Sequence, residues 1–180
     1  MTSPWRVLPL ALPVALTVLP GCGLISFDIE RDLPEQRVNG SIVSMLLDGL
    51  IDNPIPMEID LEQEIAARDA GVACGATLTS LTFSITPSSI GAADQDDFDF
   101  VEGITIHVES SRSSTSLPRR TLADLDPVPR GATTLALNPS GVDLLPYIEE
   151  GAVITSAARG SSPPDDVTFD GRYVVEVEAL

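Results

Sequence analysis

Alternation of apolar and polar residues is the feature that most constrains the fold of this chain. In LTSLTFSIT, residues 78–86, Leu81, Phe83 and Ile85 fall on one side and hydroxyl-bearing residues fall on the other. A side-chain period of two is typical of a β-strand with one buried face. The same pattern predicts further strands in IPMEIDLE, FVEGITIHVES, TTLALN, AVITSAAR and VTFDGRYVVEVEAL, at residues 55–62, 100–110, 133–138, 152–159 and 167–180.

Six or seven such strands with turn-rich connections predict an all-β fold, an antiparallel β-sandwich of the immunoglobulin-like kind. One or two short helical turns interrupt the strands. EQEIAARDAG, residues 62–71, is expected to form a short helix that Gly71 ends. In VDLLPYIEEG, residues 142–151, Pro146 limits the helix to a single turn that buries leucines and bridges the two sheets. The loop GSSPPDD, residues 160–166, is expected to form a hairpin or sheet-crossing turn.

The first 19 residues have the composition of an export signal. Arg6 precedes VLPLALPVALTVL, residues 7–19, which has no charged side chain. This run is shorter than the roughly 20 apolar residues that a membrane-spanning helix requires. It is followed by LPGC, in which Leu19, Pro20, Gly21 and Cys22 resemble the lipobox of bacterial lipoproteins. Pro20 is an unusual residue at its position in that motif.

The lipobox resemblance implies cleavage before Cys22 and acylation of its sulfur and of the new amine. Residues 1–21 are then a lipoprotein signal peptide, 22–52 a lipidated cysteine with an acidic tether, and 53–180 the sandwich domain. Gly23 rather than Asp follows Cys22, which favours the outer membrane of the bacterial cell envelope. The alternative is an ordinary signal peptide with a nearby cysteine. Within the tether, the apolar segment 41–51 is either a weak helix or a loop over an open core edge.

A second resemblance covers most of residues 55–180. FDFVEGITIHVES, VDLLPYIEEG and PPDDVTFDGRYVVEVEA together look like uncharacterised bacterial lipoproteins with an immunoglobulin-like sandwich. They are more distantly similar to the late-embryogenesis-abundant type 14 (LEA14-like) sandwich. These motifs describe strands and turns, so the resemblance implies no catalytic residue.

The charge balance excludes one large class of partners. The formal net charge is −17, and all 10 basic residues are arginines. Nucleic-acid binding requires basic groups that neutralise phosphates, so this chain is not expected to bind nucleic acid. The positive exception is RSSTSLPRR, in which Arg112, Arg119 and Arg120 are expected to pair with carboxylates of the chain itself or to contact another protein.

Four carboxylates gather in ADQDDFDF: Asp94, Asp96, Asp97 and Asp99. Oxygen ligands in such numbers suit Ca²⁺, but an EF-hand loop requires Gly at its sixth position and Glu at its twelfth. Counted from Asp94, these positions hold Asp99 and Thr105. The alternatives are therefore a looser calcium site and a solvated acidic loop.

The remaining reactive residues give no catalytic pattern. His107, the single histidine, alternates with the apolar residues of its strand and is expected on the polar face. Cys74 is expected to be a small buried thiol if Cys22 carries lipid, with intermolecular pairing as the alternative. No G-x-S-x-G elbow or glycine-rich phosphate loop is present. We therefore expect a non-enzymatic, lipid-anchored envelope protein that acts as a binding, adhesion or assembly module, with another envelope protein as a candidate partner. The alternatives are a carrier or sensor of small apolar ligands and a calcium-dependent surface module.

Overall fold

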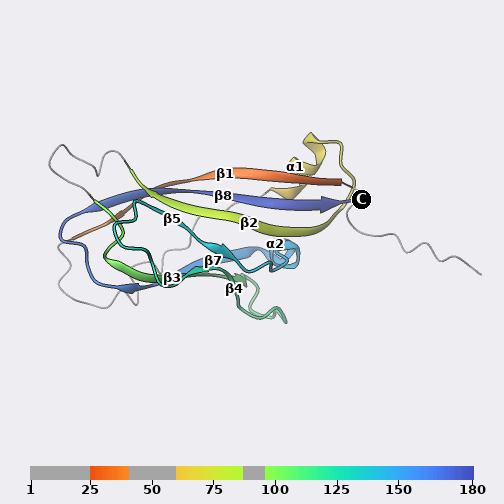
Figure 1. Ribbon diagram of the computed structural model, residues 1–180. Helices are drawn as coiled ribbons and strands as arrows, with labels where there is room; N and C mark the ends of the chain where they lie inside the picture. Colours follow the sequence, from red (N-terminus) through yellow and green to blue (C-terminus); the bar gives the residue numbers. More distant parts are fainter. Residues whose placement is uncertain (1–24, 41–59, 87–95) are drawn as a thin grey trace, which may run out of the picture.

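The computed structural model describes residues 25–40, 60–86 and 96–180, which form eight strands, two helices and their connections. Sheet A has the order β1 (Ile25–Val38), β8 (Val167–Ala179), β2 (Ala73–Ile85), β5 (Thr134–Ala136). Sheet B has the order β6 (Asn138–Pro139), β4 (Arg120–Leu125), β3 (Val101–Ser110), β7 (Ala152–Gly160). All neighbouring strands are antiparallel, and the two sheets lie face to face in Figure 1. The predicted all-β sandwich is confirmed.

The core lies between the sheets and is mostly aliphatic. Leu78, Ile106, Leu122 and Val175 are among the fully buried side chains. Three phenylalanines add edge-to-face contacts, with Phe169 in contact with both Phe83 and Phe98. Each fully buried large apolar side chain contributes about 1.5–3 kcal/mol relative to an exposed one. The period-two pattern of the sequence thus supplies the two inner faces.

The predicted strand at 133–138 serves both sheets. It pairs with β2 as β5, turns at the buried residue Leu137, and pairs with β4 as β6. Strand β8 lies between β1 and β2, and this strand order is a feature of this chain rather than part of the immunoglobulin-like comparison. The immunoglobulin-like comparison thus applies to the two-sheet architecture.

The assignment of residues 22–52 to a tether is wrong for residues 25–38, which form β1. This strand pairs with β8 over nearly its whole length. Its apolar pattern is masked because the exposed Arg31 takes the alternating position between the buried Ile29 and Leu33. Pro34 and Glu35 then add a bulge that shifts the register. The sandwich domain therefore begins well before residue 53.

Strand β4 was not predicted, because a bulge interrupts its alternation. The pairing with β3 shifts register between Ile106 and His107, where β4 contributes one extra residue. Leu122 and Ala123 are consequently both fully buried although they are adjacent. Such a pair gives no period-two signal.

The predicted strand at 55–62 is wrong at its end, because α1 (Leu61–Ala67) begins there. Asp60 caps α1 by accepting a hydrogen bond from the Gln63 backbone N–H. The short helix itself is confirmed, but it does not end at Gly71. It ends at Ala67 with Arg68 as its C-cap, and Asp69 takes the left-handed conformation. Gly71 is required instead by a close approach, since a Cβ there would lie 2.1 Å from the carbonyl oxygen of Leu180.

The helical turn around Pro146 is confirmed as α2 (Leu145–Glu150), with Pro146 in its first turn. It contacts β2 of sheet A and both β3 and β7 of sheet B, as the bridging prediction requires. Its buried residue is Tyr147, whose hydroxyl donates to the carbonyl of Pro118. The loop at 160–166 crosses between the sheets, from β7 to β8.

Some predictions fall outside the described residues. They are the signal peptide with Cys22, the apolar segment 41–51, most of the strand at 55–62, and Asp94. Neither helix of the described part has the length and apolarity needed to cross a membrane.

Candidate functional site

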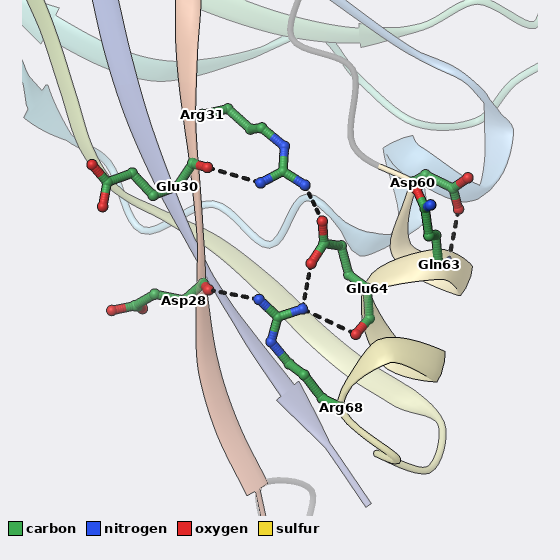
Figure 2. A network of polar contacts seen from close by, with 7 residues as sticks. All are labelled: Asp28, Glu30, Arg31, Asp60, Gln63, Glu64 and Arg68. Atoms are coloured by element: carbon green, nitrogen blue, oxygen red, sulfur yellow. Dashed lines mark hydrogen bonds and ion pairs between the residues drawn. The ribbon is translucent and has the colours of Figure 1, made fainter.

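The outer face of sheet A carries a dense set of carboxylates. Residues of β1 and β8 alternate between buried positions such as Ile29 and Val175 and the outward positions between them. The outward carboxylates, which we call the acidic face, are Asp28, Glu30, Asp32, Asp170, Glu176 and Glu178. Figure 2 shows Asp28 and Glu30 pointing away from the side of β1 on which Arg31 lies. Among the described residues, no helix or loop packs on this face and buries it.

A shallow depression of about 390 Å³ lies on the acidic face. It is lined by Asp32, Leu33, Thr82, Ser84, Asp170, Gly171 and Arg172. Its cause is the bulge in β1, where pairing passes from Leu33–Gly171 to Gln36–Phe169. Asp170 therefore has a neighbour on β2, Ser84, but no paired residue on β1. The bulge thus places Pro34 and Glu35 opposite Asp170 in place of one paired residue.

The charged groups that line the depression differ in the number of ion pairs they form. Arg172 donates to Asp32 through Nε and to Glu30 through Nη1, both at 2.8 Å. The hydrogen bond to Asp32 and the two negative charges raise the pKa of Arg172. The carboxylate of Asp170, in contrast, forms no hydrogen bond or ion pair with another residue of the described ranges. The depression thus contains one guanidinium that forms two ion pairs, that of Arg172, and one carboxylate that forms none within the described residues, that of Asp170.

On the other side of β1, a second set of ion pairs holds α1 against the strand. Glu64 accepts from both Arg31 and Arg68, and its side chain is only 11% exposed. Figure 2 shows Glu64 between the two guanidinium groups. The Arg68 hydrogen bond, together with the positive charges of both arginines, lowers the pKa of Glu64 in spite of its burial. Arg68 also lies over the ring of Phe27, 4.6 Å from its centroid.

These arginines also cover the open edge of sheet A. Arg31 donates to the carbonyl of Glu30 at 2.9 Å, and Arg68 donates to the carbonyl of Asp28 at 3.4 Å. An unpaired edge strand is a template for another strand. Because these carbonyl groups already accept hydrogen bonds, this stretch of β1 is a poor site for the addition of another strand. The face of the sheet is therefore the better candidate for a binding surface.

His107 lies on the polar face of sheet B, as its alternation predicts, between Thr121 of β4 and Thr155 of β7. It is half-buried rather than exposed. Burial, and secondarily the charge of Arg119, lowers the pKa of His107. The imidazole is therefore held toward its neutral form in a setting of threonine hydroxyls.

The predicted calcium residues are used for local structure where they are described. Asp97 accepts a hydrogen bond from the Asp99 backbone N–H, and Asp99 accepts one from the Gly131 N–H. Asp96 is buried. Within residues 25–40, 60–86 and 96–180, no group of three or more His, Cys, Asp or Glu side chains is placed to hold a metal ion.

Within the described residues, no arginine of RSSTSLPRR forms an ion pair with a carboxylate, which does not support the first of the two expected alternatives. Arg112 donates to the carbonyl of Glu149 at 3.5 Å, and Arg119 donates to the hydroxyl of Thr155 at 3.2 Å. Arg120 is exposed and forms none of the ion pairs of the described residues. The nearby carboxylate of Glu150 instead accepts from the hydroxyls of Ser110 and Thr115, which lowers its pKa.

The expectation of a buried free thiol at Cys74 is also wrong. Cys74 is disulfide-bonded and half-buried, at a bulge in β2 opposite the end of β8. The sequence contains one other cysteine, Cys22, which lies outside the described residues. Disulfides persist in oxidising compartments, so this bond agrees with an exported chain.

No protein-family model matches the chain, and no curated protein matches it. The candidate site therefore depends on the geometry alone. The signal that could locate it in the sequence is the spacing of carboxylates in DIERD and RYVVEVEAL, where charges recur at every second residue of a strand. Sequence reasoning missed it because residues 25–38 were assigned to a tether.

Proposed function

We propose that this chain is an exported, lipid-anchored envelope protein whose sandwich is a non-catalytic binding module for a basic partner. The observation that carries the binding proposal is the acidic face. It is exposed, belongs to the rigid sheet A, and holds the depression around Asp170. An array of like charges on a rigid surface attracts and orients a partner of opposite charge.

The anchor proposal rests on the LPGC motif and the apolar run before it. It has a sharp chemical consequence, because the sulfur of Cys22 cannot carry a lipid thioether and a disulfide at the same time. In an anchored protein, Cys74 must lack a disulfide to Cys22 of the same chain. The two cysteine states are therefore mutually exclusive in any one molecule.

This exclusion gives the test of the anchor. Membrane fractions from cells expressing the wild type and Cys22→Ser are compared, and the intact mass and free thiols of each protein are measured. We expect the wild type in membranes, with added acyl mass. The Cys22→Ser protein is expected to leave the membrane fraction. A wild type that lacks acyl mass and contains a reducible Cys22–Cys74 bond would overturn the anchor.

The binding surface is tested by site-specific photo-crosslinking in intact cells. A photoreactive residue replaces Val174, on the outer face of β8, or Ala157, on the outer face of β7. Both positions are apolar, face outward and lie near the middle of their strands, so they form a matched pair. We expect a discrete protein adduct from position 174 and none from position 157. Equal adducts from both, or none from position 174, would contradict a partner bound to sheet A.

A further inference from the structure

We propose that the depression on the acidic face receives an arginine side chain of a partner protein, held by the carboxylate of Asp170. This inference rests on the proposed binding function and names the group that the module recognises. The occupant is a basic segment of another protein, and the complementary charge is that of the acidic face.

The first argument is the state of Asp170. Its carboxylate is exposed, lines the depression, and has no partner among the described residues. In the bulge of β1, Pro34 and Glu35 lie opposite Asp170 without a regular strand pair. A carboxylate in this position is an acceptor with open space in front of it.

The second argument is the geometry that the face already displays. The guanidinium of Arg172 bridges Glu30 and Asp32, with both bonds at 2.8 Å. The same strands thus hold one planar guanidinium between outward carboxylates. A second guanidinium in the depression would find Asp170 and the hydroxyl oxygens of Thr82 and Ser84, which accept hydrogen bonds in several directions.

The hydroxyl groups favour arginine over lysine. Thr82 Oγ1 donates to the carbonyl of Arg172, and Ser84 Oγ shares a hydrogen bond with Thr134 Oγ1. Both oxygens therefore keep lone pairs for a donor from outside. The five N–H groups of a guanidinium can use a carboxylate and two hydroxyl oxygens together, whereas a compact ammonium reaches fewer of them.

The test uses the purified full chain and a fluorescent peptide, Gly-Arg-Gly-Arg-Gly, with Gly-Lys-Gly-Lys-Gly as the comparison probe. Binding is measured by anisotropy at low salt for the wild type, Asp170→Asn and Asp124→Asn. Asp124 is the matched control, because it is an exposed strand carboxylate on the outer face of sheet B, and its substitution changes the net charge equally. Urea unfolding of each variant verifies that the fold is retained.

We expect Asp170→Asn to weaken the arginine peptide about threefold, as for loss of one exposed ion pair, and Asp124→Asn to leave it nearly unchanged. The lysine peptide is expected to bind more weakly to the wild type. Equal weakening by both variants would show attraction to net charge alone and overturn the site, as would no binding of the arginine peptide. If crosslinking at position 174 succeeds while Asp170→Asn has no effect, this inference fails and the binding function stands.

Discussion

Strand β1 has ion pairs on both of its faces, and the two sets differ in what surrounds them. On the inner side, Glu64 lies between Arg31 and Arg68 and is only 11% exposed. On the outer side, Arg172 contacts Glu30 and Asp32, whose side chains are 56% and 75% exposed. The same chemical groups thus attach a helix on one face and remain accessible to solvent on the other. Burial, rather than the number of ion pairs, separates a structural contact from a candidate recognition surface.

The largest expected effect comes from a matched pair of Glu→Gln substitutions. Glu64→Gln removes the charge that two arginines share, and we expect it to lower the free energy of unfolding by about 1–3 kcal/mol. Glu30→Gln removes an exposed partner and should cost less than about 1 kcal/mol. Urea denaturation at neutral pH measures both. Equal losses would remove the distinction between the two faces.

Acid should abolish part of this difference. The pKa of Glu64 is lowered from its ordinary value of 4.5, so its ionised form stabilises the folded state. That contribution is complete at neutral pH and is lost as the pH falls below 4.5 through the lowered pKa. We therefore expect the stability gap between wild type and Glu64→Gln to shrink on acidification, as followed by urea denaturation at a series of pH values. A gap that widens in acid would contradict the assigned ion pairs.

Removal of Arg172 should affect binding more than stability. Arg172→Gln frees Glu30 and Asp32 and removes a positive charge beside the depression. We expect the arginine peptide to bind about two- to threefold more tightly, with little change in the free energy of unfolding. The anisotropy assay and urea denaturation measure the two quantities. Weaker binding would mean that Arg172 itself contacts the ligand.

Calcium should have the smallest effect, and it separates a metal surface from one for organic cations. The carboxylates of Asp97 and Asp99 already accept backbone hydrogen bonds. We expect millimolar Ca²⁺ to change the melting temperature by less than ~1 °C, since a ligand stabilises only as far as it binds the folded state. Differential scanning calorimetry with Mg²⁺ as the control measures this. A Ca²⁺-specific increase of several degrees would restore the calcium-dependent alternative.

The sequence predicted the parts of the fold in which every inward residue is apolar. Leu81, Phe83 and Ile85 of β2 alternate without interruption, and their strand was found. It failed where a charged residue takes an apolar position in the alternation: Arg31, exposed between the buried Ile29 and Leu33, pairs with Glu64, more than 30 residues later. A local pattern contains no information on such a partner. The bulges in β1 and β4 hid the remaining alternation in the same way.

The candidate site was less predictable than the fold. Asp170 and Asp32 are 138 residues apart in the sequence, and only the pairing of β1 with β8 brings them to one depression. The clustered aspartates at 94–99 gave the stronger local signal, yet the described members hold turns together. The position of Cys74 beside the end of β8 likewise depends on strand pairing.

The central place of β8 has a consequence for how the molecule is assembled. Strands β1 and β2 do not pair with each other, and each pairs along its length with β8. These two pairings therefore cannot form before Val167–Ala179 has been synthesised, and they close loops of many residues. Such non-local pairing is slow. Strand β1 is expected to remain without its partner strand throughout that time, which gives the machinery that handles nascent polypeptides an extended interval in which to act on it.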